Sequence, residues 1–436
     1  MRKEIQINVD DANVFLRKLI LFSSNFDTFL FLNSNSTAFK DKLPFNYINY
    51  DYIVAIDKIS YSVSTENSLN SLRKYTNIND WIFLHLSYDL KNEIYNLNSK
   101  NPDFIGFPIY YVFQPLWIII CRKGTLSILY PNKTSKSEAL NFIKKINNVQ
   151  IEEYKSFIVG EDILSLNKYS YLRTASQIKQ NIQRGDIYEM NYCVEFKKDN
   201  ISINPYKTYM ELIKYSPSPF SAFYRLNDKY LISASPERFL CKNNNILISQ
   251  PIKGTTPRGK NENDDYDLKN YLKNSVKEIS ENIMITDLVR NDLSVCAEYG
   301  SVRVDELCGV YTFPHVHQMI STISCQLRPS INFVDIIKNT FPMGSMTGAP
   351  KKRAIQLIDQ YEDFKRGLFS GSVGYITPEK NFDLNVIIRS ILYNDSLRHL
   401  SIPAGSAITS KSNIDKEYNE ILLKARALSK VLISKE

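Results

Sequence analysis

Short strand-like runs separated by polar punctuation recur through the whole chain, and they constrain its fold more than any other feature. Residues 1–150 alternate apolar runs, as in "FDTFLFLNSN" and "WIIICRKGTLSILYPN", with Asn, Ser and Asp. The alternation returns near the end in "LFSGSVGYIT", "FDLNVIIRSILY" and "LSIPAGSAIT". Runs of this length that are rich in β-branched and aromatic residues are typical of strands. We therefore expect a sheet-rich protein.

Helical patterns interrupt the strands after residue 160. "YLRTASQIKQNIQRGD" keeps helical apolar spacing up to Ile182 and stops at Gly185. A longer helical pattern spans 265–292, with acidic residues near its start, and a closing helix begins near Asp415. "YLISASPERFLCKNNNILISQPIKGT" predicts two strands joined by an Asn-rich turn. The polar stretch 147–156 suggests a boundary between an N-terminal sheet-rich subdomain, residues 1–150, and a second domain, residues 160–436.

Charge and cysteine usage exclude several classes of protein. The 54 basic and 46 acidic residues of this 436-residue chain are interleaved, so its net charge of +8 forms no block typical of a nucleic-acid-binding arm. Six cysteines without a C-x-x-C pair indicate a reducing compartment. The N-terminus lacks an apolar signal region, and the run 110–121 is too short to span a bilayer. We expect a cytoplasmic protein with no nucleic-acid and no membrane partner.

Two predicted helices carry pairs of carboxylates at three-residue spacing. Glu278 and Glu281 form one pair, and Glu417 and Glu420 form the other. This spacing places both members of a pair on one helical face. If the helices lie side by side, their oxygens could bind Mg²⁺. The alternative is a solvated charged surface.

Lys253 in "SQPIKGTTPRG" follows a predicted strand and precedes Gly254 and Thr255, where a side chain can reach a cleft. A lysine shielded from water loses its proton more easily and becomes a nucleophile. The alternative is a solvated lysine at a strand end. Glu237 on the partner strand could face the same pocket, or it could form a surface ion pair with Lys253.

Further candidates lie closer to the C-terminus. In "FPMGSMTGAPKKRAIQLI", Thr347 is a candidate helix cap, and the helix N-terminus could either hold a small anion or simply be capped. Arg389, predicted within a strand, needs a carboxylate, a phosphate or a structural ion pair. His315 and His317 have no nearby third ligand and are interpreted as structural. No Cys/His amidotransferase segment is evident, so nitrogen from glutamine would require another chain.

Ten segments in one order identify a resemblance. They are "GDIYEMNYCVEF", "SASPERFL", "PIKGTTPRG", "ENIMITDLVRNDL", "HQMIST", "FPMGSMTGAPKKRAIQLI", "GSVGY", "DLNVIIRS", "AGSAIT" and "KEYNEILLKARAL". From about residue 160 to 430 the chain resembles the chorismate-utilising enzymes of the anthranilate synthase component I family. Lys253 resembles the lysine of the para-aminobenzoate branch, whereas anthranilate synthases usually carry alanine there. Isochorismate and salicylate synthases place a water-activating lysine where this chain has Glu189, so hydrolytic chemistry is disfavoured.

The resemblance implies a fold and an activity. The fold would be α+β, with two large antiparallel sheets packed around a central cleft and helices outside, and with residues 160–436 as the chorismate-binding catalytic domain. The activity would be Mg²⁺-dependent amination of chorismate to 4-amino-4-deoxychorismate, in para-aminobenzoate and folate biosynthesis. Ammonia would come from a glutamine amidotransferase subunit, component II. The alternatives are anthranilate synthase component I, in tryptophan biosynthesis, and a non-catalytic metabolite-binding homologue.

The resemblance also assigns roles to residues. Glu281 and Glu420 would bind Mg²⁺ directly, supported by Glu278 and Glu417, and the metal would hold the ring carboxylate. Glu237 would be the general acid for the departing 4-hydroxyl, and Lys253 would add to C2 of chorismate. Arg389 would bind the enolpyruvyl carboxylate, and the remaining substrate-binding positions would be Gly254, Thr255, Thr347, Ala404 and Gly405.

Three positions depart from the pattern of the family. Many relatives have histidine where this chain has Gln318, and a carboxylate-binding tyrosine where it has Phe369. Glu189 stands where glutamine is common. We expect the fold and the reaction to survive these changes, with Arg389 left more alone in binding the substrate.

Overall fold

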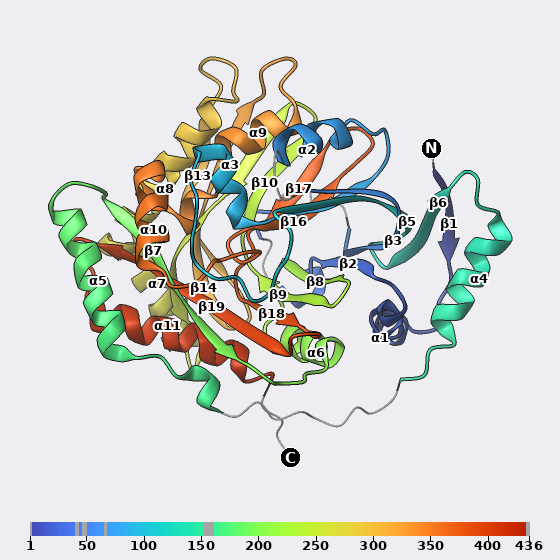
Figure 1. Cartoon of the computed structure of the whole chain (residues 1–436), viewed down its shortest axis with the longest axis horizontal. Coiled ribbons are helices and arrows are strands. Elements are labelled where there is room, and N and C mark those ends of the chain that lie inside the picture. The colour runs from blue at the N-terminus through green and yellow to red at the C-terminus, as the bar shows by residue number, and fades with distance from the viewer. Residues whose placement is uncertain (1, 40–42, 46–49, 65–67, 152–160, 433–436) are drawn as a thin grey trace.

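The strands of the chain form one hydrogen-bonded network (Figure 1). The computed structural model describes residues 2–39, 43–45, 50–64, 68–151 and 161–432. Within these ranges 19 strands are joined, and their pairings are antiparallel. The strand-like runs of the sequence therefore do build a sheet, as expected.

Strand β5 (Tyr110–Arg122) divides this network into two arms. One edge of β5 pairs with β3, and the first arm continues through β2, β8, β9, β18, β19 and β7. The other edge pairs with β6 and with β4, from which the second arm continues through β16, β17, β10, β11 and β14. Both β12 and β13 pair with β14, β15 pairs with β7, and β1 pairs with β6.

The bounds of the strands are as follows. In the first arm they are β3 (Tyr52–Ser64), β2 (Thr28–Asn33), β8 (Phe220–Leu226), β9 (Lys229–Ser235), β18 (Ser390–Asn394), β19 (His399–Thr409), β7 (Glu189–Lys198) and β15 (Gly348–Ala349). In the second arm they are β4 (Ile82–Leu86), β16 (Ser372–Ile376), β17 (Phe382–Asn385), β10 (Arg238–Asn243), β11 (Ile246–Gln250), β12 (Ile252–Pro257), β13 (Arg303–Thr312) and β14 (Val316–Gln326), with β6 (Thr125–Pro131) and β1 (Arg2–Ile7) beside β5.

Apolar side chains on alternate positions of the strands enter two different cores. In β2, Leu30 and Leu32 belong to one buried cluster, whereas Phe29 and Phe31 belong to another. The first cluster contains residues of both arms, so it joins them. The helices that cover the sheets are α1 (Ala12–Phe22), α2 (Ser68–Thr76), α3 (Lys91–Tyr95), α4 (Lys136–Asn147), α5 (Lys168–Gln183), α6 (Pro205–Tyr215), α9 (Phe333–Thr340) and α10 (Lys351–Tyr361), together with α7, α8 and α11. Because successive side chains of a strand point to opposite faces, both faces of β2 are buried.

Several local predictions are confirmed. Helix α5 ends at Gln183, and Gly185 adopts a positive φ of 83° after it. Strands β10 and β11 form the predicted hairpin, and Asn244 in its turn has a φ of 53°. The closing helix α11 (Ile414–Ser429) begins one residue before Asp415. These features depend on neighbouring residues, so the sequence could specify them locally.

The prediction of one long helix over 265–292 is wrong. The structure has two helices, α7 (Glu262–Asn274) and α8 (Val276–Ser294), separated at Ser275. Ser275 has an extended backbone, and its side chain accepts a hydrogen bond from the backbone N–H of Glu278. A serine that caps a new helix ends the preceding one.

The run "FDLNVIIRSILY" is also not one strand, so the prediction of a mid-strand Arg389 is wrong. Strand β17 ends at Asn385 and β18 begins at Ser390. Arg389 lies between them with a positive φ of 51°. The chain breaks here because β17 pairs within the second arm and β18 within the first. Arg389 thus lies where the chain crosses from one arm to the other.

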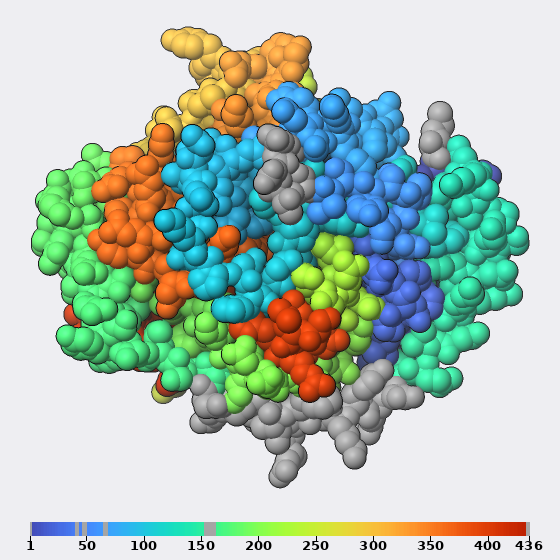
Figure 2. Space-filling model, viewed as in Figure 1, coloured from blue at the N-terminus to red at the C-terminus, as the bar shows by residue number. Residues whose placement is uncertain are grey.

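Segments that are far apart in the sequence lie against each other. Figure 2 shows the light-blue region of α3 beside the orange region of α10, and Lys91 Nζ lies 2.8 Å from Asp359 Oδ2 across this contact. Strands β2 and β4 pair with the much later β8 and β16. The predicted boundary falls partly on residues 152–160, outside the described ranges, so the division into two domains stays a prediction. No helix among the described residues is long and apolar enough to cross a membrane.

Candidate active site

Lys253 and Glu189 form an ion pair that joins the two arms. Lys253 lies on β12 and Glu189 begins β7. Lys253 Nζ is 2.7 Å from Glu189 Oε1, and the side chains are 13% and 1% exposed. The alternative of a solvated strand-end lysine is therefore excluded.

The expectation that burial would make Lys253 neutral is wrong for this state of the protein. Burial lowers the pKa of Lys253, but the carboxylates of Glu189 and Glu281 outweigh it and raise the pKa above its ordinary value. The sequence pattern around Lys253 contained no sign of Glu189, which lies 64 residues earlier. Lys253 is therefore an ammonium here.

The backbone around Lys253 is fixed by helix α8. Asn282 on α8 donates its side-chain amide to the carbonyls of Lys253, at 3.1 Å, and of Met319, at 3.2 Å. Gly254 has a φ of 95°, and a Cβ at this position would lie 3.2 Å from Cβ of Glu278. Glycine is required because the backbone conformation and the close approach of α8 both disfavour a side chain.

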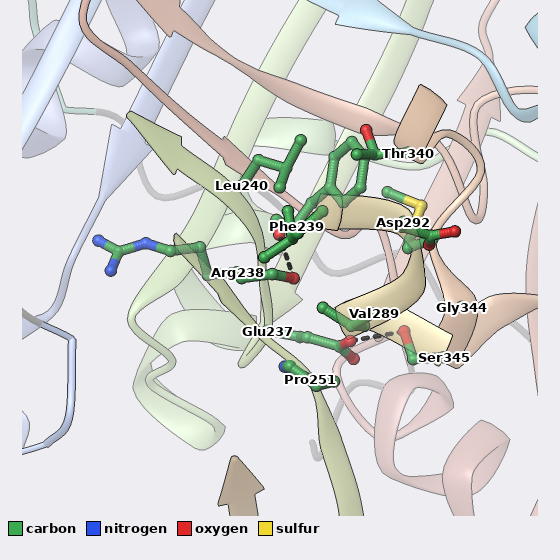
Figure 3. Close-up of a pocket in the computed structure, with 13 residues that line it drawn as sticks. Glu237, Arg238, Phe239, Leu240, Pro251, Val289, Asp292, Thr340, Gly344 and Ser345 are labelled. Carbon is green, nitrogen blue, oxygen red and sulfur yellow. Dashed lines mark hydrogen bonds between the residues drawn. The ribbon is translucent and has the colours of Figure 1, made fainter. Parts of the chain in front are cut away.

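Glu237 lies in the connection between β9 and β10 and is buried. Ser345 donates its hydroxyl to Glu237 Oε1 at 2.6 Å (Figure 3). Burial raises the pKa of Glu237 to about 7, although Ser345 and the charge of Lys253 oppose the shift. The surface ion pair considered for Glu237 and Lys253 is therefore excluded, and the acid is buried close enough to sense the lysine.

A cavity lies beside Glu237, between β10, α8 and the turn at 343–345. Figure 3 shows the Glu237 carboxyl group turned toward Ser345, with Pro251 and Val289 close by. Leu293 and other apolar groups also line this cavity. The apolar surroundings explain why the pKa of Glu237 is raised, because they solvate its charged form poorly.

Three glutamates from α8 and α11 surround Lys277, and a fourth, Glu420, pairs with Lys424. Lys277 Nζ lies 3.8 Å from Glu278 Oε1, 3.8 Å from Glu281 Oε1 and 3.7 Å from Glu417 Oε1. Glu420 lies one helical turn beyond Glu417, and Lys424 Nζ is 2.7 Å from its Oε1. The beginnings of the two helices therefore meet, and Glu417 is buried, whereas the side chain of Glu420 is 46% exposed.

The four glutamates outnumber the two lysines beside them, Lys277 and Lys424, which therefore do not neutralise all of the negative charge. Burial raises the pKa of Glu281 to about 7, with Lys253 and Lys277 opposing the shift. Burial and the neighbouring Glu420 raise the pKa of Glu417. For Glu420 burial is outweighed, chiefly by Lys424, and its pKa is lowered.

In the part of the chain that the structure describes, no three His, Cys, Asp or Glu side chains are close enough to hold a metal ion.

The guanidinium group of Arg389 has no hydrogen-bond or ion-pair partner among the described residues, although the backbone carbonyl accepts from Ala234 N–H at 3.0 Å. Burial lowers the pKa of its guanidinium group, and only the more distant charge of Glu420 opposes this shift. The described residues therefore supply no structural ion pair for Arg389. Because a guanidinium without a partner is costly to bury, this position calls for an anionic ligand.

The remaining predicted residues lie on the same elements or close to them. Thr347 is not the cap of α10, because its hydroxyl donates to the Met343 carbonyl at 3.1 Å and Pro350 holds the N-cap position. Thr255 is exposed on β12. Ala404 and Gly405 lie on β19 opposite β7, and a Cβ at Gly405 would be 2.5 Å from Cys193 Sγ.

Lys351, at the start of α10, is engaged by other groups. Its ammonium lies 2.5 Å from Asp292 Oδ2 and donates to the Thr340 carbonyl at 2.9 Å. It is therefore not free to bind an anion.

Sequence reasoning missed Lys277 and Ser345. Lys277 was detectable in principle, because it precedes Glu278 directly and stands four residues before Glu281. Ser345 had no such signal, since it is 108 residues from Glu237. All three departures, Glu189, Gln318 and Phe369, are buried, and Gln318 Oε1 has no hydrogen-bond partner among the described residues.

The histidines have ordinary structural contacts. His317 Nε2 is 3.0 Å from Asp265 Oδ1, and Nδ1 is 3.2 Å from the Thr312 hydroxyl. The ring of His315 stacks on Tyr215.

Comparisons with known proteins identify the family of the chain. Residues 36–430 match the family described as chorismate binding enzyme. Aminodeoxychorismate synthase component 1 of Bacillus subtilis (strain 168) is 31% identical over 359 residues, which cover 80% of this chain and 76% of that protein. The probable chloroplastic aminodeoxychorismate synthase of Oryza sativa subsp. japonica is 40% identical over 273 residues, which cover 62% of this chain and only 30% of that protein.

A solved structure gives the fold. Anthranilate synthase component I from Streptococcus pneumoniae TIGR4 superimposes with a TM-score of 0.75 at 22% identity, covering 89% of this chain and 94% of that one. The expected α+β fold, with large antiparallel sheets, is therefore confirmed.

Proposed function

The chain belongs to the chorismate-binding enzymes, and on this premise we propose that it aminates chorismate to 4-amino-4-deoxychorismate, the aminodeoxychorismate synthase reaction. One observation carries the proposal: a buried amine, Lys253, and a buried acid with a pKa of about 7, Glu237, share one site. A nucleophile and a proton donor in such proximity suit the displacement of a hydroxyl group.

Charged side chains would bind the substrate. Chorismate carries two carboxylates, and Arg389 would bind the enolpyruvyl one, which supplies the anion that its partnerless guanidinium lacks. The ring carboxylate would lie toward the four glutamates and be lined by Gly254, Thr255, Thr347, Ala404 and Gly405. Side chains at Gly254 and Gly405 would contact Glu278 and Cys193 too closely, so both positions favour glycine.

The glutamates suit a magnesium ion chemically. Mg²⁺ prefers carboxylate oxygens, and Glu281 and Glu417 are carboxylates whose pKa values burial raises, so a bound cation would offset the cost of their charge. Glu281 and Glu420 would hold the ion directly, with Glu278 and Glu417 in support. When bound, the ion would neutralise the charge between the glutamates and the ring carboxylate.

The reaction would proceed in two displacements. Lys253 would form a bond to C2, the two ring double bonds would shift, and the C4–O bond would break. Glu237 would give its proton to the departing hydroxyl, which leaves as water. Ammonia would then add at C4, and the reverse shift would release Lys253. Ammonia would come from a glutamine amidotransferase subunit, because this sequence has no recognisable amidotransferase segment.

Product analysis tests the proposal. The purified chain, given chorismate, ammonium and Mg²⁺, is expected to form 4-amino-4-deoxychorismate. Fluorescent anthranilate formed without an added lyase would place the chain in the other branch. No turnover under these conditions would support a binding protein instead.

A variant tests the nucleophile separately. Lys253→Ala is expected to abolish most amination while chorismate binding, measured by calorimetry, changes little. Without a nitrogen source, intact-protein mass spectrometry should detect a chorismate adduct on the wild type and none on the variant. Near-normal turnover by the variant, with no adduct on either protein, would reject this role.

A further inference from the structure

The Lys253–Glu189 ion pair has a consequence for the proposed nucleophile. A protonated amine has no free electron pair and cannot form a bond to carbon. Even at the ordinary lysine pKa, only roughly one amine in 2,500 is neutral at pH 7. We propose that Glu189 is a positioning residue that holds the Lys253 ammonium and accepts one of its protons when chorismate is bound. This inference rests on the proposed function, because it concerns the amine that the reaction would use.

The geometry singles out Glu189 among the carboxylates near Lys253. Glu281, Glu420 and Glu237 influence the charge of Lys253 from a distance, whereas Glu189 Oε1 is in hydrogen-bond contact at 2.7 Å. Glu237 accepts the hydroxyl of another residue instead. Proton transfer requires this direct contact.

The Glu189 carboxylate is also free to accept a proton. Its second oxygen, Oε2, is buried and has no hydrogen-bond partner among the described residues. Hydrogen bonds to a carboxylate stabilise its charged form and weaken it as a base. Among the described residues Oε2 receives no such bond, so Glu189 has an acceptor oxygen that no other donor occupies.

The backbones on both sides are held in place. Glu189 pairs with Thr409 of β19 on one side and Ala349 of β15 on the other. A Cβ at Gly348 would lie 2.1 Å from the Glu189 carbonyl oxygen, so β15 fits closely against it. Asn282 fixes the carbonyl of Lys253. The short distance between the two side chains is therefore a property of the fold.

The protons balance over a full cycle. A proton passes from Lys253 Nζ to Glu189 Oε1, and the neutral amine then adds to C2 while Glu237 protonates the departing hydroxyl. After ammonia adds at C4, Lys253 leaves as a neutral amine and recovers its proton from Glu189. The new C4 ammonium loses a proton to Glu237. The net change converts chorismate and ammonia to the amino product and water.

The test measures formation of the Lys253 adduct against pH, with chorismate, Mg²⁺ and no nitrogen source. In the wild type the proton moves from Lys253 to Glu189 without passing through solvent. The rate of adduct formation is therefore not expected to rise with pH between pH 6 and 9. Glu189→Gln cannot accept the proton and should be at least roughly tenfold slower at pH 7, since general bases contribute about that much or more. The ratio of its rate to the wild-type rate should rise with pH as solvent removes the proton, because the titration of Glu237 affects both proteins alike. Chorismate affinity should change less than about threefold.

A second measurement needs no substrate. Cyanate modifies neutral amines, and loss of the Glu189 charge lowers the pKa of Lys253. Peptide mass spectrometry should therefore find faster carbamylation of Lys253 in Glu189→Gln than in the wild type at pH 8. Asp80→Asn, which breaks the distant ion pair with Arg2 at 2.8 Å, is the matched control and should leave both profiles unchanged.

The outcomes separate the two proposals. A wild type that turns over chorismate, together with a Glu189→Gln profile identical to it, would overturn the role of Glu189 alone. A wild type with neither adduct nor turnover would overturn the proposed function and, with it, this inference. If Glu189→Gln does not fold, Glu189→Asp decides: a slower adduct without a rising limb supports proton acceptance, and an unchanged rate contradicts it.

Discussion

Removing the Ser345 hydroxyl should move the pH dependence of the proposed reaction upward. Ser345 donates to Glu237 Oε1 at 2.6 Å in a buried setting. This bond stabilises the charged carboxylate, so it lowers the pKa of Glu237, which burial raises to about 7. Without the bond, burial is less opposed and the pKa of Glu237 rises further. Ser345→Ala therefore keeps the acid protonated at higher pH.

The magnitude follows from the hydrogen bond. A bond to a charged group contributes about 1.5 to 3 kcal/mol, and one pKa unit corresponds to about 1.4 kcal/mol. The alkaline limb should thus move up by roughly one unit or more. With an acid of pKa about 7, roughly a tenth is protonated at pH 8, and with pKa about 8 roughly half is protonated. When each protein is normalised to its own rate at pH 6, the variant should be about fivefold faster than the wild type at pH 8.

The assay is formation of the Lys253 adduct without ammonium, followed by intact-protein mass spectrometry from pH 6 to 9. Omitting ammonium avoids the titration of the nitrogen substrate itself. Ser249→Ala is the control, because its hydroxyl lines the same cavity but donates to the Phe239 carbonyl at 2.8 Å. An alkaline limb that stays in place in Ser345→Ala, or moves to lower pH, would refute the reasoning.

Four further predictions follow from the site. Arg389→Gln should weaken chorismate binding at least roughly tenfold in calorimetry, since charge-assisted hydrogen bonds to a carboxylate are lost; unchanged affinity would contradict the role of Arg389. Glu281→Gln and Glu420→Gln should each weaken Mg²⁺ binding and cost about a hundredfold in activity, and unaltered magnesium titrations would reject the metal site. The chain alone should use ammonium and not glutamine as nitrogen donor; glutamine-dependent turnover would reveal an amidotransferase site within it. Glu237→Gln should raise the melting temperature more at pH 8 than at pH 5. Because the pKa of Glu237 is raised to about 7, the free energy of unfolding of the wild type falls by up to about 3 kcal/mol as pH rises from about 4.5 to 7. Equal shifts of the melting temperature at both pH values would contradict this.

Features with a short sequence range could be predicted. The stop at Gly185, the hairpin turn at Asn244 and the start of α11 all depend on residues within a few positions. The pairing of Glu278 with Glu281 on one face follows from helical geometry, and the structure places both near α11. Helical periodicity and helix capping depend on residues only a few positions apart, so they can be recognised directly in the sequence.

Features created by the crossing of the two arms could not be predicted. The charge of Lys253 is set by Glu189 on another strand, and the lack of a partner for Arg389 depends on every element around it. The break between β17 and β18 is invisible in an uninterrupted apolar run, because its cause is that each half pairs with a different arm. Ser275 is a residue type that often caps helices, and it does cap α8. The helical spacing of apolar residues on both sides of it obscured the break.

The division of the network at β5 has a consequence for how the chain is made. Strand β4 is buried, and its antiparallel neighbours are β5 and the late strand β16. Just beyond β4, Ser87 donates its hydroxyl to the carbonyl of Gly367, 280 residues later. At a synthesis rate of about 5 to 20 residues per second, roughly 15 to 60 s pass before that partner leaves the ribosome. Throughout this time an apolar strand edge is uncovered, which makes the nascent chain a substrate for chaperones and a risk for aggregation.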